Sequence, residues 1–136
     1  MILDTSVLIE AERGHVRMEA LLASVGDEPV GIAAVTAAEL LFGCHRASTA
    51  ASRARRFAFV DAVLDLVPVI PFGLVEARRH AELWDHLARR GRMIGAHDLI
   101  IGATALAHGQ SVATLNVREF RRLPGLRLVR MREFRA

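Results

Sequence analysis

The first nine residues place an aspartate between two apolar segments, and this arrangement constrains the fold most. Met1, Ile2 and Leu3 form a short apolar run that is typical of a buried strand, and the pattern after Asp4 indicates a helix. Strands of an open parallel sheet end at a crevice where ligands bind. We therefore expect Asp4 to lie at the mouth of a functional site.

The alternation of strand and helix continues along the chain. Further predicted strands lie at residues 30–35, 67–71, 111–115 and 126–129. Predicted helices occupy residues 5–13, 15–25, 36–46, 54–66, 72–90, 97–108 and 116–120, with a polar linker at 48–52. Strands that alternate with helices predict an α/β fold with a parallel sheet. The length of 136 residues, without a repeat or a low-complexity tract, predicts a single domain over residues 1–136.

Two of these helices carry more specific expectations. Thr36, followed three residues later by Glu39, matches a capping box at the start of the helix after the second strand. The spacing in the helix at 72–90 predicts four core residues, Ala77, Ala81, Trp84 and Leu87.

Composition excludes several kinds of protein. A hydrophobic fraction of 52% is enough for a folded core and argues against disorder. The single cysteine, Cys44, rules out an internal disulfide and a thiolate metal site. All 18 basic residues are arginines, so a lysine-dependent Walker A phosphate loop is absent. Arginines cluster at 53–56, 78–92 and 118–135, which is a weak indication of nucleic-acid binding.

Nothing in the sequence predicts a membrane protein. The longest apolar run, at residues 99–107, is too short to cross a bilayer. The N-terminal residues do not match a secretory signal, because Asp4 interrupts the only apolar candidate. We therefore expect a cytoplasmic protein.

Three carboxylates occur in apolar surroundings, where solvated acids are not expected. They are Asp4, Glu39 and Asp98. Each also has a purely structural interpretation: Asp4 as a helix cap, Glu39 as the second half of the capping box, and Asp98 as an acid favoured by a helix dipole. In a right-handed parallel sheet Asp4 and Glu39 share one edge, whereas Asp98 shares it only if its helix starts there.

Convergence of these acids would have a chemical consequence. Like charges raise one another's pKa unless a cation neutralises them. Oxygen ligands without cysteine or paired histidine suit Mg²⁺ or Mn²⁺ rather than Zn²⁺. Such an ion polarises phosphoryl oxygens and activates water, so the pattern suggests a phosphodiester substrate.

Four segments together resemble a known family. They are LDTSVLI at 3–9, VTAAELLFG at 35–43, IGAHDLIIGATALAHG at 94–109 and ATLNVREFRRLPGL at 113–126. In this order they resemble the PIN-domain ribonucleases, and more closely the VapC-type toxins of bacterial toxin–antitoxin pairs. The resemblance implies a PIN-like α/β/α sandwich with a central parallel sheet, and cleavage of RNA that depends on Mg²⁺ or Mn²⁺.

The resemblance also implies roles for individual residues. Acids at the positions of Asp4, Glu39 and Asp98 hold the metal in this family, and a fourth catalytic position, often aspartate, falls on Asn116. A hydroxyl after the first aspartate falls on Thr5 or Ser6. Glu119, one helical turn beyond Asn116, is a possible supplement, or a solvated acid paired with Arg118 or Arg122. His97 abuts Asp98, but a single histidine at a helix start is more often a cap or a packing residue.

The partners implied by the resemblance are an RNA substrate such as tRNA, a cognate antitoxin that inserts a side chain among the acids, and a second copy of the chain. Arg92 and Arg118 are the arginines we expect on the rim, as contacts to the RNA backbone. Residues 18–22 and 57–64 are candidate interface segments, with core packing as the alternative. Two other functions remain open at this point: a PIN-like module that binds RNA or protein without cutting, and a flap-type DNA nuclease.

Overall fold

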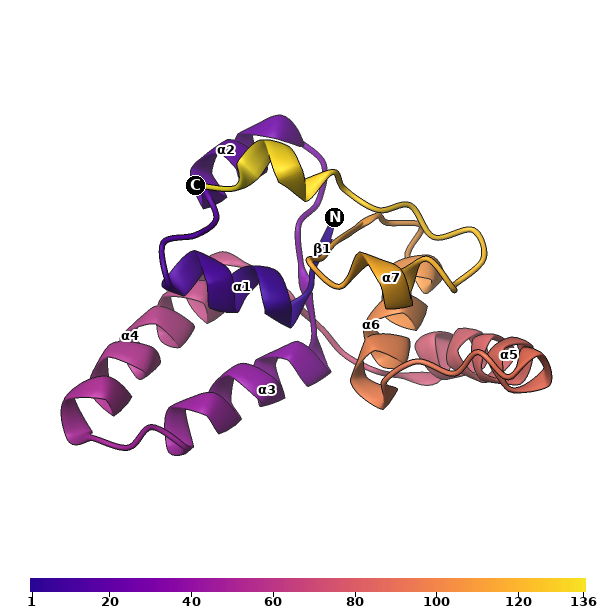
Figure 1. The fold of residues 1–136 in the computed structure, drawn as a ribbon, viewed down its shortest axis with the longest axis horizontal. Coiled ribbons are helices and arrows are strands. Elements are labelled where there is room, and N and C mark those ends of the chain that lie inside the picture. The colour runs from indigo at the N-terminus through magenta and orange to yellow at the C-terminus, as the bar shows by residue number, and fades with distance from the viewer.

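The computed structural model describes all residues, 1–136, and its centre is a sheet of very short parallel strands (Figure 1). β1 (Ile2–Leu3) pairs with β4 (Val112–Ala113), and β2 (Ile32–Ala33) pairs with β3 (Val69–Ile70), both in parallel. A parallel bridge between Ile2 and Gly31 joins the two pairs. The predicted parallel sheet is therefore confirmed. The predicted strand at 126–129 is wrong, because only an isolated bridge from Leu128 to Val112 forms there.

Eight helical segments connect and cover these strands. They are α1 (Thr5–Glu12), α2 (Met18–Ser24), α3 (Ala34–His45), α4 (Ala50–Leu66), α5 (Leu74–Arg90), α6 (Ala96–Ala107), α7 (Val117–Phe120) and the 3₁₀ helix η1 (Met131–Phe134). All seven predicted helices are present. None of the eight is both long enough and apolar enough to serve as a membrane span.

Two helix starts differ from the sequence prediction. α3 begins at Ala34, directly after β2, so Thr36 lies inside the helix and the predicted capping box is wrong. α4 begins at Ala50, because the Thr49 hydroxyl accepts a hydrogen bond of 3.1 Å from the Ser52 N–H and caps the helix. Most of the predicted linker at 48–52 is therefore helical.

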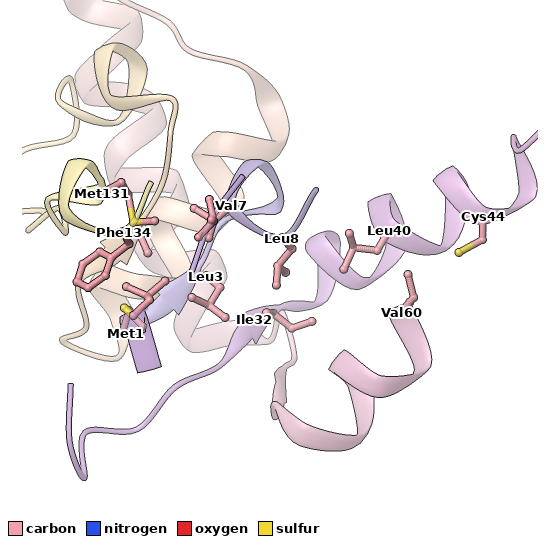
Figure 2. Packing of buried hydrophobic residues seen from close by; sticks show 13 residues of the cluster. Met1, Leu3, Val7, Leu8, Ile32, Leu40, Cys44, Val60, Met131 and Phe134 are labelled. Carbon is pink, nitrogen blue, oxygen red and sulfur yellow. The ribbon is translucent and has the colours of Figure 1, made fainter. Parts of the chain in front are cut away.

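The side chains of the sheet divide between two hydrophobic clusters, one on each face. Along β1, Leu3 belongs to a cluster of 13 buried residues with parts of α1, α3, α4 and η1 (Figure 2), whereas Ile2 belongs to a second cluster of 12 with α5, α6 and α7. Neighbouring residues of a strand point to opposite faces of the sheet. A sheet covered by helices on both sides therefore has one hydrophobic cluster on each face. This arrangement confirms the predicted α/β/α sandwich.

The buried face of α5 differs from the predicted one. Leu83 and Leu87 are buried against the second cluster, but Trp84 is 55% exposed and Ala81 is exposed as well. The face is set by contact with α6, and Trp84 lies off that face, where its ring makes an edge contact with His80. Only Leu87 of the four predicted core residues is fully buried.

Candidate active site

Four helices begin close together at the end of the sheet where β1 and β4 finish. In Figure 1 the first turns of α1, α3, α6 and α7 face the middle of the molecule. Asp4 directly precedes α1, Glu39 lies in the second turn of α3, Asp98 in the first turn of α6, and Asn116 directly precedes α7. The fold therefore brings the predicted acids from three distant parts of the sequence to one region.

Asp4 is held by two hydroxyl groups. Its side chain is buried, and its Oδ2 accepts hydrogen bonds of 2.7 Å from Ser6 Oγ and 2.6 Å from Thr114 Oγ1. The two hydroxyls are fixed in turn, because Ser6 Oγ accepts from the Leu115 N–H and Thr114 Oγ1 from the Asn116 N–H. Asp4 is the N-cap residue of α1, but its side chain makes no capping hydrogen bond, so capping does not account for the buried carboxylate.

Glu39 projects from α3 toward α1 and α6. Its Oε1 accepts a hydrogen bond of 2.9 Å from Thr5 Oγ1, and its Oε2 lies 3.5 Å from His97 Nδ1. The Thr5 hydroxyl also lies 3.2 Å from Thr36 Oγ1. Since Thr5 follows Asp4 and His97 precedes Asp98, these contacts place Glu39 beside both other acids.

Asp98 forms a polar group with two residues of the α7 region. Its Oδ2 accepts a hydrogen bond of 2.7 Å from Asn116 Nδ2, which also lies 3.2 Å from Glu119 Oε2. Burial, together with the neighbouring carboxyl groups of Glu119 and Asp4, raises the pKa of Asp98 to about 7, although the hydrogen bond from Asn116 acts in the opposite direction. Hydrogen bonding to Asp98 lowers the pKa of Glu119. The opposite shifts mean that Asp98 holds a proton more readily than Glu119 does.

The chemistry of this region suits a hard divalent cation. All the donors are carboxylate, amide or hydroxyl oxygens, and the repulsion between Asp4 and Asp98 is of the kind that such an ion relieves. In the present side-chain arrangement, however, no three acidic, histidine or cysteine side chains are close enough together to hold a metal ion. Ligation by Asp4, Glu39 and Asp98 would therefore require these side chains to turn toward a common point, and their role as metal ligands stays a prediction.

The two arginines predicted on the rim make no contact with the acids. Arg92 and Arg118 are both exposed. The arginine that does approach is Arg122, whose Nη1 donates a hydrogen bond of 2.9 Å to the Met93 carbonyl and whose charge lowers the pKa of Glu119. The spacing of 3 residues between Glu119 and Arg122 in the sequence had indicated this pairing.

Thr114 is the site residue that the sequence analysis did not single out. It directly follows β4, as Asp4 directly follows β1, and parallel pairing of the two strands brings them together. The sequence analysis placed Thr114 inside the predicted strand at 111–115, whereas the observed strand ends at Ala113, so no sequence signal singled this hydroxyl out. Its partner is 110 positions away, so spacing alone could not assign it.

The fold and this cluster define a class of protein: a small α/β/α domain with an acidic centre at the sheet edge. A family model described as "PIN domain" matches residues 1–126. Ribonuclease VapC1 of Rickettsia felis is 36% identical over 129 residues, which cover 95% of this chain and 94% of that protein. The tRNA(fMet)-specific endonuclease VapC of Salmonella typhimurium is 31% identical over 97 residues, 71% of each chain.

A solved structure agrees with these sequence matches. VapBC-5 from Mycobacterium tuberculosis, described as a member of the VapBC family of toxin-antitoxin systems, superposes with a TM-score of 0.77. The sequence identity is 32%, and the match covers 95% of this chain and 96% of that one. The chain therefore belongs to the PIN-domain family and, within it, to the VapC ribonucleases.

Proposed function

We propose that this protein is an endoribonuclease that requires Mg²⁺ or Mn²⁺ and acts as the toxin of a toxin–antitoxin pair in the cytoplasm. The observation that carries the proposal is the meeting of Asp4, Glu39 and Asp98 where four helices begin, each acid oriented by a hydrogen bond from the protein. Water hydrolyses one phosphodiester bond, leaving a 5′-phosphate and a 3′-hydroxyl. Relatives named as ribonucleases support RNA as the substrate.

The metal would be held by Asp4, Glu39 and Asp98. Bound there, the ion would supply a polarised phosphoryl oxygen and a water of lowered pKa. Ser6 and Thr114 orient the Asp4 carboxylate, and Thr5 orients Glu39. Asn116 orients Asp98 without adding a charge. The Glu119 carboxylate beside it would be a supplementary ligand.

Cleavage of purified tRNA tests the proposal, since a relative carries the name of a tRNA-specific endonuclease. The wild type is expected to cut tRNA in Mg²⁺ or Mn²⁺ and to stop when EDTA is added. Asp4→Asn keeps the shape of the side chain and removes its charge, so it should lose most of the activity. Asp27→Asn, which changes an exposed aspartate in a turn, is the matched control and should cleave normally. Cleavage by Asp4→Asn at the wild-type rate would refute the proposal.

The antitoxin partner is proposed from relatives described as VapBC toxin–antitoxin complexes. Co-expression with a candidate antitoxin should abolish the cleavage of tRNA, and a stable complex should survive gel filtration. If the protein keeps full activity with every candidate antitoxin tested, the toxin assignment is wrong. The nuclease assignment would still stand.

A homodimer is proposed from exposed apolar side chains near the start of α5. Leu74 and Val75 are 67% and 63% exposed, and the partly exposed rings of Phe72 and Trp84 both contact His80 on the same helix region. A patch of this kind on a soluble domain commonly marks an interface. The segments at 18–22 and 57–64 are less suitable, because Leu21 and Val60 are buried in the core. Light scattering should give a dimer for the wild type and a monomer for Leu74→Arg.

A further inference from the structure

A polar groove runs from the acidic cluster between α1, α3 and α4, the three helices on one side of Figure 1. Its volume is about 330 Å³. Glu39 forms part of its wall, so the groove and the acidic cluster share a side chain. Gly43 lines the groove one helical turn, about 6 Å, farther along α3. A polymer bound at the acids can therefore continue into the groove.

The wall beyond Glu39 is positively charged. It contains three arginines, Arg13 directly after α1 and Arg55 and Arg56 from α4, against the single carboxylate of Glu12. Because Arg13 follows α1 and the other two arginines lie on α4, positive charge lines the groove from two separate segments. The groove therefore attracts an anion at the point where a bound polymer would leave the acids.

The three arginines differ in how freely they can bind a ligand. Arg56 is fixed, because its Nη1 donates a hydrogen bond of 2.9 Å to the Gly43 carbonyl. Arg13 is partly neutralised by Glu10, at 2.8 Å. The Arg55 side chain is exposed and makes no hydrogen bond or ion pair with the protein, so its guanidinium group is fully available.

The composition of the wall favours a phosphate backbone over a protein partner. Only three of the ten lining residues are hydrophobic, Ile9, Leu40 and Val60. The buried centre of a protein interface is apolar and poor in charged residues. Guanidinium groups match the paired oxygens of a phosphate.

We propose that this groove binds the phosphate backbone of the RNA strand beyond the scissile phosphodiester, with Arg55 as the main phosphate contact and Arg13 as the second. The inference rests on the proposed ribonuclease function and names the path of its substrate. Because these contacts lie away from the acids, they contribute to RNA binding and not to the chemical step.

The test uses the variant Arg13→Ala/Arg55→Ala in the full chain. Binding of fluorescein-labelled tRNA is measured by anisotropy in EDTA over a series of salt concentrations. The dissociation constant should rise several-fold, and the slope of log affinity against log salt should become shallower by about 1.4 to 1.8 for two lost phosphate contacts. Arg53→Ala is the matched control, because Arg53 is an exposed arginine of α4 outside the groove and should bind as the wild type does.

Two further variants separate charge from structure. Arg55→Lys keeps the charge and should retain most of the salt dependence, whereas Arg55→Glu should weaken binding more than the alanine change. With Mn²⁺, the double variant should raise the KM for tRNA, while hydrolysis of bis-p-nitrophenyl phosphate, which is too small to reach the groove, should not change.

The outcomes distinguish this inference from the proposed function. If the wild type cleaves tRNA but the double variant keeps the wild-type affinity and salt slope, the groove assignment is overturned and the nuclease stands. If the wild type cleaves no RNA while the double variant still loses tRNA binding, the nuclease fails and the groove assignment stands. If the double variant binds tRNA normally but no longer binds the antitoxin, the groove is a protein-binding site. This result would also overturn the inference.

Discussion

The Asp4 carboxylate depends on Thr114, a residue at the far end of the chain. Thr114 is fully buried, donates to Asp4 Oδ2 at 2.6 Å and accepts from the Asn116 N–H at 2.9 Å. One hydroxyl thus connects the first acid of the site to the backbone that carries Asn116. Its position makes it an orienting residue for Asp4.

Replacing Thr114 by valine should separate orientation from charge. Valine fills the same space but leaves the Asn116 N–H without its acceptor, at a stability cost of about 1 to 3 kcal/mol. We expect a clear fall in the kcat for RNA cleavage, measured after correction for the folded fraction. Thr104→Val is the control, since the buried Thr104 hydroxyl bonds only to the Ile100 carbonyl within α6. Equal activity in both variants would show that the hydroxyl of Thr114 does not orient Asp4.

The raised pKa of Asp98 predicts a pH effect on stability. Burial, with the neighbouring Glu119 and Asp4 carboxyl groups, raises its pKa from the ordinary value of 3.8 to about 7, so between these pH values the folded state holds a proton that the unfolded state releases. Stability should therefore fall as pH rises from about 4 to about 7, and Asp98→Asn should remove part of that fall. Thermal melts in EDTA across this range measure it. If the melting temperatures of the wild type and Asp98→Asn change with pH in parallel, the raised pKa of Asp98 is contradicted.

At the scale of residues, the sequence analysis predicted which candidate site residues lie near one another. It did not predict the hydrogen bonds that they make. Asp4, Glu39, Asp98 and Asn116 lie in one region, because each directly precedes a helix or lies in its first two turns, and these four helices begin at one edge of the sheet. The hydroxyl contacts depend on pairing between β1 and β4, which are separated by most of the chain. The exposed arginines were unpredictable for another reason: a solvated side chain leaves no pattern that fixes its direction.

At the scale of elements, local signals fixed the helices and tertiary contact fixed their faces. The N-terminal cap of α4 is a local feature that the sequence analysis treated as linker. The buried face of α5 is set by α6, so periodicity alone selected a neighbouring face that contains the exposed Trp84. The predicted strands were also too long. Strand length depends on pairing with neighbouring strands, and only two residues of each strand are paired in this way.

Removing the cap of α4 should destabilise the protein. Thr49→Ala deletes the acceptor for the Ser52 N–H and should lower the free energy of unfolding by about 1 kcal/mol. Urea denaturation measures the change. Ser48→Ala is the control, because Ser48 is exposed and outside the cap. Equal losses in the two variants would mean that the hydroxyl of Thr49 does not cap the helix.

At the scale of the whole molecule, the two-sided sheet explains why one small chain can assemble its site. Alternate residues of β1 are buried in clusters on opposite faces, so helices must cover both faces and return to the same edge. Four helices then begin where the strands end. The alternation of strands and helices predicted the α/β fold with a parallel sheet. The sandwich with helices on both faces was implied by the resemblance to the PIN domains.

The most direct test of the account is a titration of the protein with Mn²⁺, followed by electron paramagnetic resonance of the free ion. The account predicts binding by the wild type and at least tenfold weaker binding by each of Asp4→Asn, Glu39→Gln and Asp98→Asn, because all three acids hold one ion. Asp27→Asn should bind as the wild type does. Wild-type affinity in any of the three site variants, or no binding by the wild type, would contradict a shared metal centre.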